Sequence, residues 1–467
     1  MDMCHGPLLK KIVLFALPLM FSYILQLAFN AVDLIVIGQY TDHKALAAIG
    51  STFNINALVI NLFIGFSVGG NVVAATRMGA RDIPGMSRAV NTSMAVGLWG
   101  GISLMIIGLA AARPMLIWMG TPADILPKSC AYIWICFLGI PSIMLYNFGC
   151  AILRAVGDTR RPLYYLVIAG VVNVLLNLFF VIVCGMNVEG VAIATVISHV
   201  VSAILVVRTV CKLPEEYRLT LAMFKMDPAT LKEIVHIGCP AGIQSSCFAI
   251  SNLLIQSAIN SFGAVAMAAA AVATVLEGII YVGSLSFHQT VTTFVAQNLG
   301  GRKYKRILHS VLWCYMCAFI ANIAIGYIFF WQGKFMIGLF NPDPEVIREG
   351  LIRAKCLFLF YFLCGMMDVT SGALRGLGYS ISSAIVSLVG ACAFRSLWVL
   401  FVLPLHRTME FLLLSYPISW CMVGAVNIVI FILAYRKLVR TQCARTVKWS
   451  QNGPGIPRGY RVLGSSK

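Results

Sequence analysis

The sequence predicts an all-α membrane protein in which twelve transmembrane helices form two six-helix lobes. Three observations support this prediction: the composition, the number of long apolar runs and an internal repeat. Of the 467 residues, 60% are hydrophobic and 11% are charged, whereas soluble domains carry about 25% charged residues. A chain this apolar cannot fold as a soluble globule, so bilayer hydrocarbon must cover much of its surface.

Twelve apolar runs are long enough to cross a bilayer, because about 20 helical residues span the hydrocarbon. An even number of spans places both termini on the same side of the membrane. The runs are residues 13–38, 46–74, 89–112, 129–152, 163–184, 190–210, 232–259, 264–297, 307–331, 351–374, 382–404 and 410–435.

Five landmarks recur in the second half of the chain at an offset of 221 or 222 residues, which indicates an internal duplication. Each half has six helices, so the halves cross the bilayer in the same sense, related by a pseudo-twofold axis along the membrane normal. This arrangement predicts a site between the lobes near the midplane. The landmarks are Pro18 and Pro240, Asn30 and Asn252, Gly79 and Gly300, Leu153-Arg154 and Leu374-Arg375, and Ile197-Ser198 and Ile418-Ser419.

Lys and Arg residues are unevenly distributed between the predicted loops. The net charge is +18, and 26 of the 35 Lys and Arg residues lie on the side of the N-terminus. This asymmetry is the positive-inside pattern, so we expect a multi-pass plasma-membrane protein with both termini in the cytoplasm. The charge then reflects topology and contact with anionic membrane lipids, and it does not indicate nucleic-acid binding.

Charge and Pro content divide the chain into five predicted parts. The tail is basic and rich in Gly and Pro, so we expect it to be disordered and to touch anionic lipid. The parts are a cytoplasmic N-terminus (1–11), an N-lobe with helices 1–6 (12–211), a polar cytoplasmic linker (212–231), a C-lobe with helices 7–12 (232–437) and a cytoplasmic tail (438–467).

One acid, Asp33, lies near the end of the first apolar run. An ionised carboxylate at such depth is costly unless it is paired, hydrated or protonated. We therefore interpret Asp33 as a residue that binds and releases a coupling cation. The alternative is a helix-end acid at the level of the lipid headgroups.

Amide and hydroxyl side chains could complete this site. Asn173 and Asn177 are four residues apart and share a helix face, and Thr195 lies in the next predicted helix. With Asp33 they could accept a proton or coordinate Na⁺, so we predict an H⁺ or Na⁺ coupling site at these four residues. Asn and Thr in spans also serve as contacts between helices, and this alternative stays open. Candidates for lining the substrate cleft are Gln26, Asn30 and Tyr281.

The second lobe carries a further polar set, namely Gln256, Glu277, Asp368 and Arg395. A lone Arg within a span requires a carboxylate partner, so we expect Arg395 to pair with Glu277 or Asp368. Such a pair could be a static bridge or could switch during transport, and the sequence favours neither. His199 and His288 are predicted to be core or interfacial residues, not proton relays.

Other function classes find less support. Cys314-x-x-Cys317 has metal-site spacing, but it lies mid-span without a second pair, so we expect no metal and no cofactor beyond an ion gradient. No catalytic His, Asp or Cys residues cluster at an interface, so we predict no enzyme activity. The two-lobe repeat is typical of monomeric carriers and disfavours an ion channel.

The chain resembles the multidrug and toxic compound extrusion (MATE) family over about residues 8–440. The motifs that carry the resemblance are Asn30-Ala-Val-Asp33 with Gly38, Gly65-Phe-Ser67-Val-Gly69, Arg77-Met-Gly79-Ala-Arg81-Asp82, Leu153-Arg154-Ala-Val-Gly157-Asp158-Thr159-Arg160-Arg161-Pro162, Gly238-Cys-Pro240, Gln297-Asn-Leu-Gly300 and Gly372-Ala-Leu-Arg375-Gly376-Leu-Gly378.

The resemblance implies a V-shaped pair of bundles that exports amphipathic, often cationic drugs or toxins by antiport against H⁺ or Na⁺. The family's first-helix acid falls on Asp33, its fifth-helix Asn on Asn173 and its sixth-helix Thr on Thr195. Its fifth-helix acid is replaced by Asn177. Second-lobe acids found in one branch fall on Phe248 and Cys364, so they are absent here.

The transport cycle that we expect begins with a substrate entering a cleft between the lobes from the cytoplasm. Protonation of Asp33 from outside would bend the first helix near Pro18 and release the substrate outward. The alternative function is a flippase for lipid-linked oligosaccharides, from the same superfamily. Its pyrophosphate cargo needs a cationic cavity, and Arg395 alone against three span acids disfavours it.

Overall fold

The computed structural model describes residues 1–40, 43–119, 121–122, 125–220 and 226–452. All regular structure within these residues is helical, and they form no strand. The helices of the first half are α1 (Leu8–Tyr40), α2 (His43–Ala80), α3 (Ile83–Trp118), α4 (Leu126–Ala155), α5 (Arg160–Leu178) and α6 (Val188–Cys211). Those of the second half are α7 (Pro228–Asn260), α8 (Ala264–Gly300), α9 (Tyr304–Trp331), α10 (Gly333–Phe340), α11 (Pro344–Leu357), α12 (Tyr361–Gly376), α13 (Ser380–Ser387), α14 (Phe394–Leu397), α15 (Met409–Leu413) and α16 (Ser415–Asn452).

Short π-helical or 3-10 turns extend or join several of these helices. They are Phe179–Val183 after α5, Phe358–Phe360 between α11 and α12, Leu388–Ala393 between α13 and α14, and Trp398–Val402 with Leu403–Leu405 after α14. Because of these joins, α11 with α12 forms one span, α13 with α14 a second, and α15 with α16 a third.

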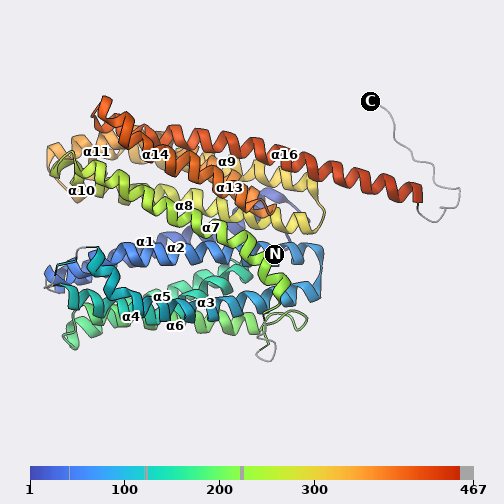
Figure 1. The fold of residues 1–467 in the computed structure, drawn as a ribbon, viewed down its shortest axis with the longest axis horizontal. Coiled ribbons are helices and arrows are strands. Elements are labelled where there is room, and N and C mark those ends of the chain that lie inside the picture. Colours follow the sequence, from blue (N-terminus) through green and yellow to red (C-terminus); the bar gives the residue numbers. More distant parts are fainter. Residues whose placement is uncertain (41–42, 120, 123–124, 221–225, 453–467) are drawn as a thin grey trace.

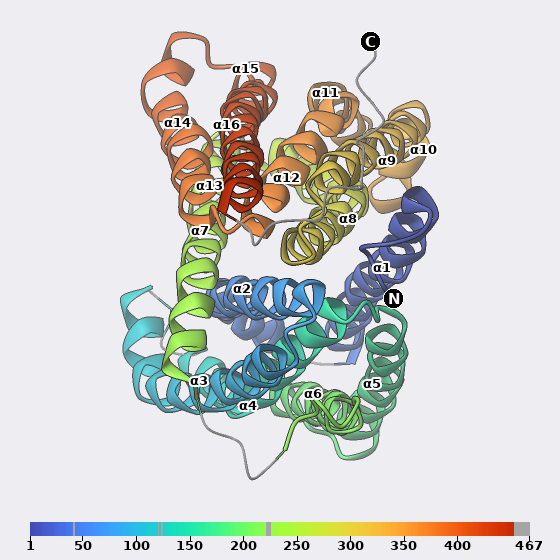
Figure 2. The same cartoon turned by 90° about the vertical axis from the view of Figure 1, so that its right-hand side faces the viewer.

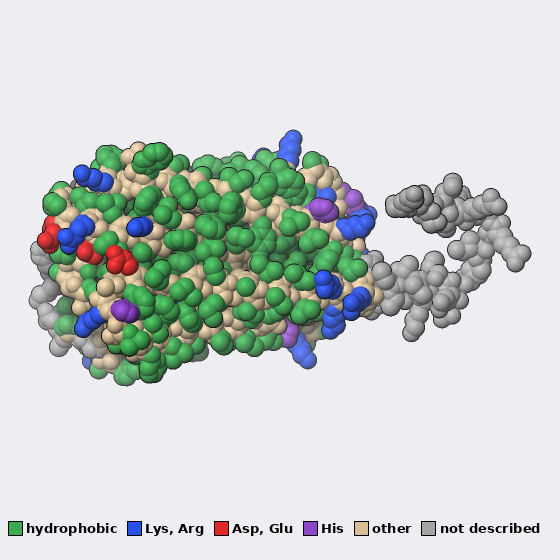
Figure 3. Space-filling model, turned by 90° about the horizontal axis from the view of Figure 1, so that it is seen from above, with side chains coloured by type: hydrophobic (Ala, Val, Ile, Leu, Met, Phe, Trp, Pro, Cys, Tyr) green, Lys and Arg blue, Asp and Glu red, His purple; other side chains and the backbone are tan. Residues whose placement is uncertain are grey.

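Eleven stretches of the described residues are long and apolar enough to cross a membrane, and the 38-residue α2 is a further long helix. A broad hydrophobic band covers the middle of the face in Figure 3. Lys and Arg are visible at both ends of this face, whereas Asp and Glu are visible only at the end opposite to the one where α16 leaves the bundle. The predicted all-α membrane fold is thus confirmed.

The helices form two groups (Figures 1 and 2). Helices α2–α6 pack together in one group, and α8–α16 pack together in the other. Between the groups, α1 runs along one flank and α7 along the opposite flank. The groups join mainly where α2 packs against α7 and α8.

Contacts between α2 and α8 follow the sequence repeat. The Thr293 hydroxyl donates to Asn71 Oδ1 at 3.0 Å, and these two residues are 222 positions apart. Both side chains are fully buried. The offset of 221 residues that relates α2 to α8 pairs Asn71 with Thr292, so this bond joins Asn71 to the neighbour of its counterpart. A contact this near to a counterpart lies beside the pseudo-twofold axis.

Two glycines make a symmetric contact beside this axis. A Cβ atom on Gly79 would lie 1.8 Å from the Gln297 carbonyl oxygen, and one on Gly300 would lie 1.9 Å from the Thr76 carbonyl oxygen. Gly79 and Gly300 are repeat counterparts, and so are Thr76 and Gln297, since each pair is 221 residues apart. Any side chain here would force α2 and α8 apart, so both glycines are required for this crossing.

The N-terminal segment, residues 1–6, bridges the two groups. Its amino group donates to the Val156 carbonyl at 2.9 Å beyond α4, and the Met3 amide donates to Gln297 Oε1 at 3.1 Å on α8. Gln297 in turn donates to the Ala155 carbonyl at 2.8 Å. The Met3 side chain is 0% exposed, so this segment is an integral part of the junction.

Some predicted boundaries are wrong. Helix α7 begins at Pro228, inside the predicted linker, because Asp227 caps it: the Thr230 amide and hydroxyl donate to the Asp227 carboxylate at 2.9 and 2.6 Å. These bonds hold the pKa of Asp227 below its ordinary value. Helix α16 continues to Asn452, into the tail that was expected to be disordered.

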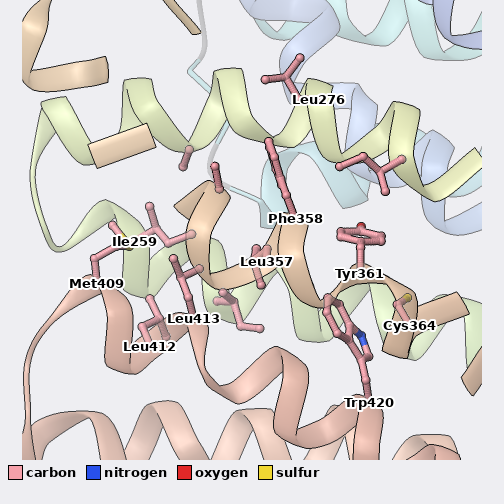
Figure 4. Close-up of a cluster of buried hydrophobic side chains, with 14 of the residues drawn as sticks. Ile259, Leu276, Leu357, Phe358, Tyr361, Cys364, Met409, Leu412, Leu413 and Trp420 are labelled. Atoms are coloured by element: carbon pink, nitrogen blue, oxygen red, sulfur yellow. The ribbon is translucent and has the colours of Figure 1, made fainter. Parts of the chain in front are cut away.

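The second group has its own apolar core. Leu357, at the end of α11, lies near Leu413 of α15, and Tyr361, at the start of α12, lies beside Trp420 of α16 (Figure 4). The core extends to Leu276 of α8 and Trp420 of α16. This packing positions the polar side chains of α8, α11 and α16 described below.

Candidate functional site

A cavity of about 270 Å³, called the first-group cavity below, lies between α1 and the first group of helices. All its lining residues come from α1, α2, α4, α5 and α6, whereas the sequence analysis expected a cleft between the lobes. Its polar lining holds one acid and no Lys or Arg, and consists of Gln26, Asn30, Asp33, Asn147, Asn173, Thr195, Ser198, His199 and Ser202.

A chain of hydrogen bonds connects the four predicted coupling residues. Asn177 Nδ2 donates to Asp33 Oδ1 at 2.6 Å and lies 3.2 Å from Asn173 Oδ1. Asn173 Nδ2 donates to Thr195 Oγ1 at 3.4 Å, and that hydroxyl donates to the Val191 carbonyl at 2.9 Å. The structure therefore brings together all four residues, which come from three helices.

This arrangement leaves room for a cation beside Asp33. The Asp33 carboxylate has neutral amide neighbours, and none of the ion pairs in the described residues includes it. Asn177 is 0% exposed, and its Oδ1 is a buried oxygen without a hydrogen-bond partner. A half-buried carboxylate next to a buried, unsatisfied amide oxygen is a chemical environment that a proton or a small hard cation would satisfy.

The Phe29 ring of α1 packs directly over Gly170 of α5. A Cβ atom on Gly170 would lie 1.9 Å from Phe29 Cζ, so a larger residue at position 170 would displace this ring. Gly170 lies one turn before Asn173 on α5, and Phe29 lies one turn before Asp33 on α1. The contact therefore lies beside the bond between Asn177 and Asp33.

The predicted substrate-cleft residues separate into two places. Gln26 and Asn30 line the first-group cavity together with Asp33. Tyr281 lies instead on α8 in the second group, with its ring 6.5 Å from that of Tyr361. The cavity lining therefore includes two of the three candidates.

The predicted partner of Glu277 is wrong. Glu277 pairs with Arg353 of α11: Nε to Oε1 is 2.6 Å and Nη2 to Oε2 is 3.0 Å. The two side chains are 11% and 7% exposed. A bidentate pair this well buried satisfies the Glu277 carboxylate and leaves it with no need of Arg395.

Arg395 has aromatic and hydroxyl neighbours instead of an acid. Its guanidinium lies 4.2 Å from the centre of the Tyr416 ring and 6.0 Å from that of Trp420. Arg395 Nε also donates to Ser419 Oγ at 2.9 Å. No ion pair in the described residues joins Arg395 to Glu277 or Asp368. The faces of the two aromatic rings stabilise the buried guanidinium in place of a carboxylate.

Asp368 belongs to a separate cluster around Arg375. Arg375 donates to His288 Nε2 at 3.1 Å and to Gln244 Oε1 at 2.7 Å. His288 Nδ1 lies 2.8 Å from the Asp368 carbonyl oxygen. Since Arg only donates and a carbonyl only accepts, these contacts fit an imidazole with its proton on Nδ1. His288 is a buried core residue, as predicted.

The remaining predicted residues lie apart from these clusters. Gln256 is exposed on α7 and donates to Asn260 Oδ1 at 2.9 Å. His199 lines the first-group cavity. Sequence reasoning missed Arg353 and Gln244 altogether. The signal for Arg353 was its place inside the apolar run 351–374, where a cation needs a partner.

The described residues contain no group of three or more His, Cys, Asp or Glu side chains that could hold a metal ion. Cys314 of the Cys-x-x-Cys motif is buried on α9, and Cys317 is partly buried. The polar groups that can act on a ligand are therefore the carboxylates, amides and guanidinium groups described above.

The described part of the chain combines eleven apolar spans and the long helix α2 with a cavity that is lined by a half-buried acid, which is the architecture of a membrane transporter. The MatE family profile matches residues 18–179 and 240–399, so the chain belongs to this family of multidrug efflux transporters and is not an enzyme.

Relatives with curated descriptions match most of the chain. A "Probable multidrug resistance protein YpnP" of Bacillus subtilis (strain 168) is 27% identical over 85% of this chain and 88% of its own length. A protein described as "FAD transporter", from Shewanella oneidensis, is 25% identical over 90% of this chain and 94% of its own length. A solved structure described as "MATE in complex with MaL6" superposes with a TM-score of 0.87 at 22% identity, covering 94% of this chain and 99% of that one. This structural match supports the fold alone.

Proposed function

We propose that this chain is a secondary active transporter that exports amphipathic, often cationic compounds in exchange for H⁺, with Asp33 as the residue that binds the proton. The observation that carries the proposal is the Asp33 carboxylate, which lines a cavity without cations and is held by Asn177 at 2.6 Å. Asn177, Asn173 and Thr195 are positioning residues in this scheme. Na⁺ is the alternative coupling ion.

The charge of the cavity supports a cationic substrate. With one acid and no Lys or Arg in its lining, the cavity attracts positive charge and disfavours the pyrophosphate of a lipid-linked oligosaccharide. Phe29 and Tyr146 offer aromatic faces to a cation. A volume of about 270 Å³ is at the small end for a drug-sized ligand, so a bulky compound would extend beyond it.

Exchange follows if proton and substrate compete for Asp33. A ligand shifts a two-state equilibrium only through its different affinities for the two states. A charged Asp33 attracts the cationic substrate, whereas a protonated Asp33 no longer does. Protonation also weakens the bond to Asn177, which frees α1 to bend at Pro18, where the helix lacks one backbone hydrogen bond.

The topology that we propose puts both termini in the cytoplasm of a multi-pass plasma-membrane protein that acts as a monomer. The five-part division of the chain stays a proposal as well, with the linker ending at Asp227. The support for this topology is that the end of the face where α16 leaves the bundle shows Lys and Arg without Asp or Glu (Figure 3).

The test is substrate transport by the full chain in proteoliposomes under a pH gradient or a Na⁺ gradient imposed separately. We expect the pH gradient to drive transport and Asp33→Asn to reduce this transport at least about 100-fold, because the titrating group is lost. Asp368→Asn, which removes an acid outside the cavity, is the matched control. Persistence of pH-driven transport in Asp33→Asn would rule out this role for Asp33, and a response to Na⁺ alone would identify the other ion.

A further inference from the structure

A basic cavity of about 740 Å³ lies at the end of the molecule where α8 turns into α9 and residues 435–440 of α16 pass by (Figure 1). It is separate from the Asp33 cavity and has no part in the proposed exchange. Two of its lining residues are Tyr304 and Tyr435. Six of the others are cations: Arg302, Lys303, Lys305, Arg306, Arg436 and Arg440.

These cations lack anionic partners. No Asp or Glu lines the cavity, and none of the ion pairs in the described residues includes any of the six. Arg306 donates only to backbone carbonyls, those of Met3 at 2.8 Å and His5 at 3.1 Å. Residues 441–467 contain no Asp or Glu. Six cations without an acid among them repel one another and create a positive electrostatic potential in the cavity. This potential attracts an anion from outside the chain.

The cavity lies at the depth of the lipid headgroups. Tyr304 is the first residue of the span 304–331, and Tyr435 to Arg440 form the last turns of the span 409–441. Tyr residues at the two span ends are typical of the membrane–water interface. Phosphate groups of phospholipids occupy that level, and basic pockets between spans on the cytoplasmic side bind anionic headgroups.

Apolar side chains continue from the cations toward the membrane. Leu312 lies seven residues after Lys305 on α9, and Leu433 lies seven residues before Arg440 on α16, so each pair shares a helix face. Leu312 is 55% exposed and Leu433 is 60% exposed. Exposed apolar residues next to a basic cavity can contact the acyl chains of a lipid. A soluble phosphate compound has no acyl chains and would not contact these residues.

We propose that this cavity binds the headgroup of an anionic phospholipid, with the strongest preference for a headgroup that carries two phosphates. The six cations surround the phosphates, and the acyl chains lie along α9 and α16. The inference goes beyond the proposed exchange and uses the proposed topology only to name the leaflet, which is the cytoplasmic one. Arg306 links the lipid to the N-terminal segment, which bridges the two groups of helices.

The experiment is lipid titration of the purified full chain in neutral detergent, followed by native mass spectrometry. The probes are a two-phosphate phospholipid, phosphatidylglycerol, phosphatidylcholine and inorganic phosphate. We expect binding to weaken in that order, with no competition from millimolar inorganic phosphate. Equal binding of phosphatidylcholine, or full displacement by inorganic phosphate, would overturn the proposal.

The test variant replaces three exposed cavity cations, Lys303, Lys305 and Arg440, by Gln. At roughly fivefold in affinity for each cation near a membrane surface, the variant should bind the two-phosphate lipid about 100-fold more weakly. The control replaces Arg160, Lys212 and Lys232, which lie outside the cavity, by Gln. Lys305→Gln alone, which should weaken binding about fivefold, keeps the test valid if the triple variant does not fold. Equal affinity in the cavity and control variants would contradict the proposal.

Discussion

The two groups of helices are repeats of one sequence pattern, yet their acids lie at positions that the repeat does not relate. At the repeat offset of 222 residues, Asp33 of α1 corresponds to Ile255 of α7, which is buried among apolar residues. At the offset of 221, Asp368 of α12 corresponds to Asn147 of α4, which lines the first-group cavity. The fold is duplicated, but the charge is not.

The acids of the two groups also differ in their partners. Asp33 has a neutral amide partner and faces a cavity without Lys or Arg. The negative charge of its carboxylate is therefore not neutralised by a cationic side chain in that cavity. Glu277 has a bidentate bond to Arg353 in the core of the second group. A paired acid gains little from binding an external cation, whereas an unpaired one gains most. Asp368, the other span acid of the second group, is in none of the ion pairs of the described residues, and its Oδ2 has no hydrogen-bond partner. We therefore propose ion binding at Asp33 and a structural role for the pair of Glu277 and Arg353.

The largest effect that we expect comes from breaking the second-group pair. Glu277→Ala leaves Arg353 charged and unpaired at 6% exposure, which should lower the free energy of unfolding by about 3–5 kcal/mol. The measurement is thermal unfolding of the purified protein in detergent.

The double variant Glu277→Ala, Arg353→Met separates a structural role from ion binding. Removing the stranded charge should recover most of the lost stability, and the folded protein should still exchange substrate for protons. A stable double variant that no longer transports would place the coupling site in the second group and reverse the comparison.

A medium effect is expected from adding an acid to the first group. Asn177→Asp puts a second carboxylate next to Asp33, where Asn177 Nδ2 now lies 2.6 Å from Asp33 Oδ1. Two adjacent carboxylates cannot both stay charged without a cation or a shared proton, so the variant should lose about 1–3 kcal/mol of stability at neutral pH in the absence of Na⁺. Unfolding in NaCl and in choline chloride measures this difference.

The matched control is Asn147→Asp, which adds an acid to the same cavity and which the repeat relates to Asp368. Asn147 donates to the Ile143 carbonyl of its own helix at 2.9 Å and has no bond to Asp33, so its variant should show a weaker response to Na⁺. Equal stability of Asn177→Asp in both salts would show that Asp33 and residue 177 are not close enough to share a cation.

Sequence reasoning succeeded where one residue stands out from its surroundings. Asp33, Asn173, Asn177 and Thr195 are polar residues in apolar runs, and the structure brings these four side chains together. The repeat offset likewise follows from the sequence alone, and the symmetric contacts of Gly79 and Gly300 give it a physical meaning.

Pairings between distant helices were not predictable in the same way. Glu277 could have met Arg353, Arg375 or Arg395, and packing of α11 against α8 decides among them. We expected Arg395 to pair with an acid because the sequence does not show that Tyr416 and Trp420 lie close to its guanidinium. The cavity also depends on the packing of α1 against α5, which no sequence pattern indicates.

The smallest effect that we expect is at the far end of the hydrogen-bond chain. Thr195→Val removes a hydroxyl that accepts from Asn173 at 3.4 Å, a long bond worth no more than about 1 kcal/mol. Transport driven by a pH gradient should fall by about two- to fivefold, as Asn173 and Asn177 hold Asp33 less firmly. Initial transport rates as a function of the imposed gradient measure this change.

Thr209→Val is the control, because Thr209 lies on the same helix and bonds to Tyr165 at 2.6 Å outside the cavity. The comparison between Thr195→Val and Asp33→Asn decides what the chain of side chains does. If Thr195 only positions Asn173, its loss weakens the site in proportion to one long hydrogen bond. If Thr195→Val reduced transport as much as Asp33→Asn, the hydroxyl would itself be a ligand of the ion. Na⁺ would then be the better candidate, because Na⁺ needs several oxygen ligands and a proton needs one.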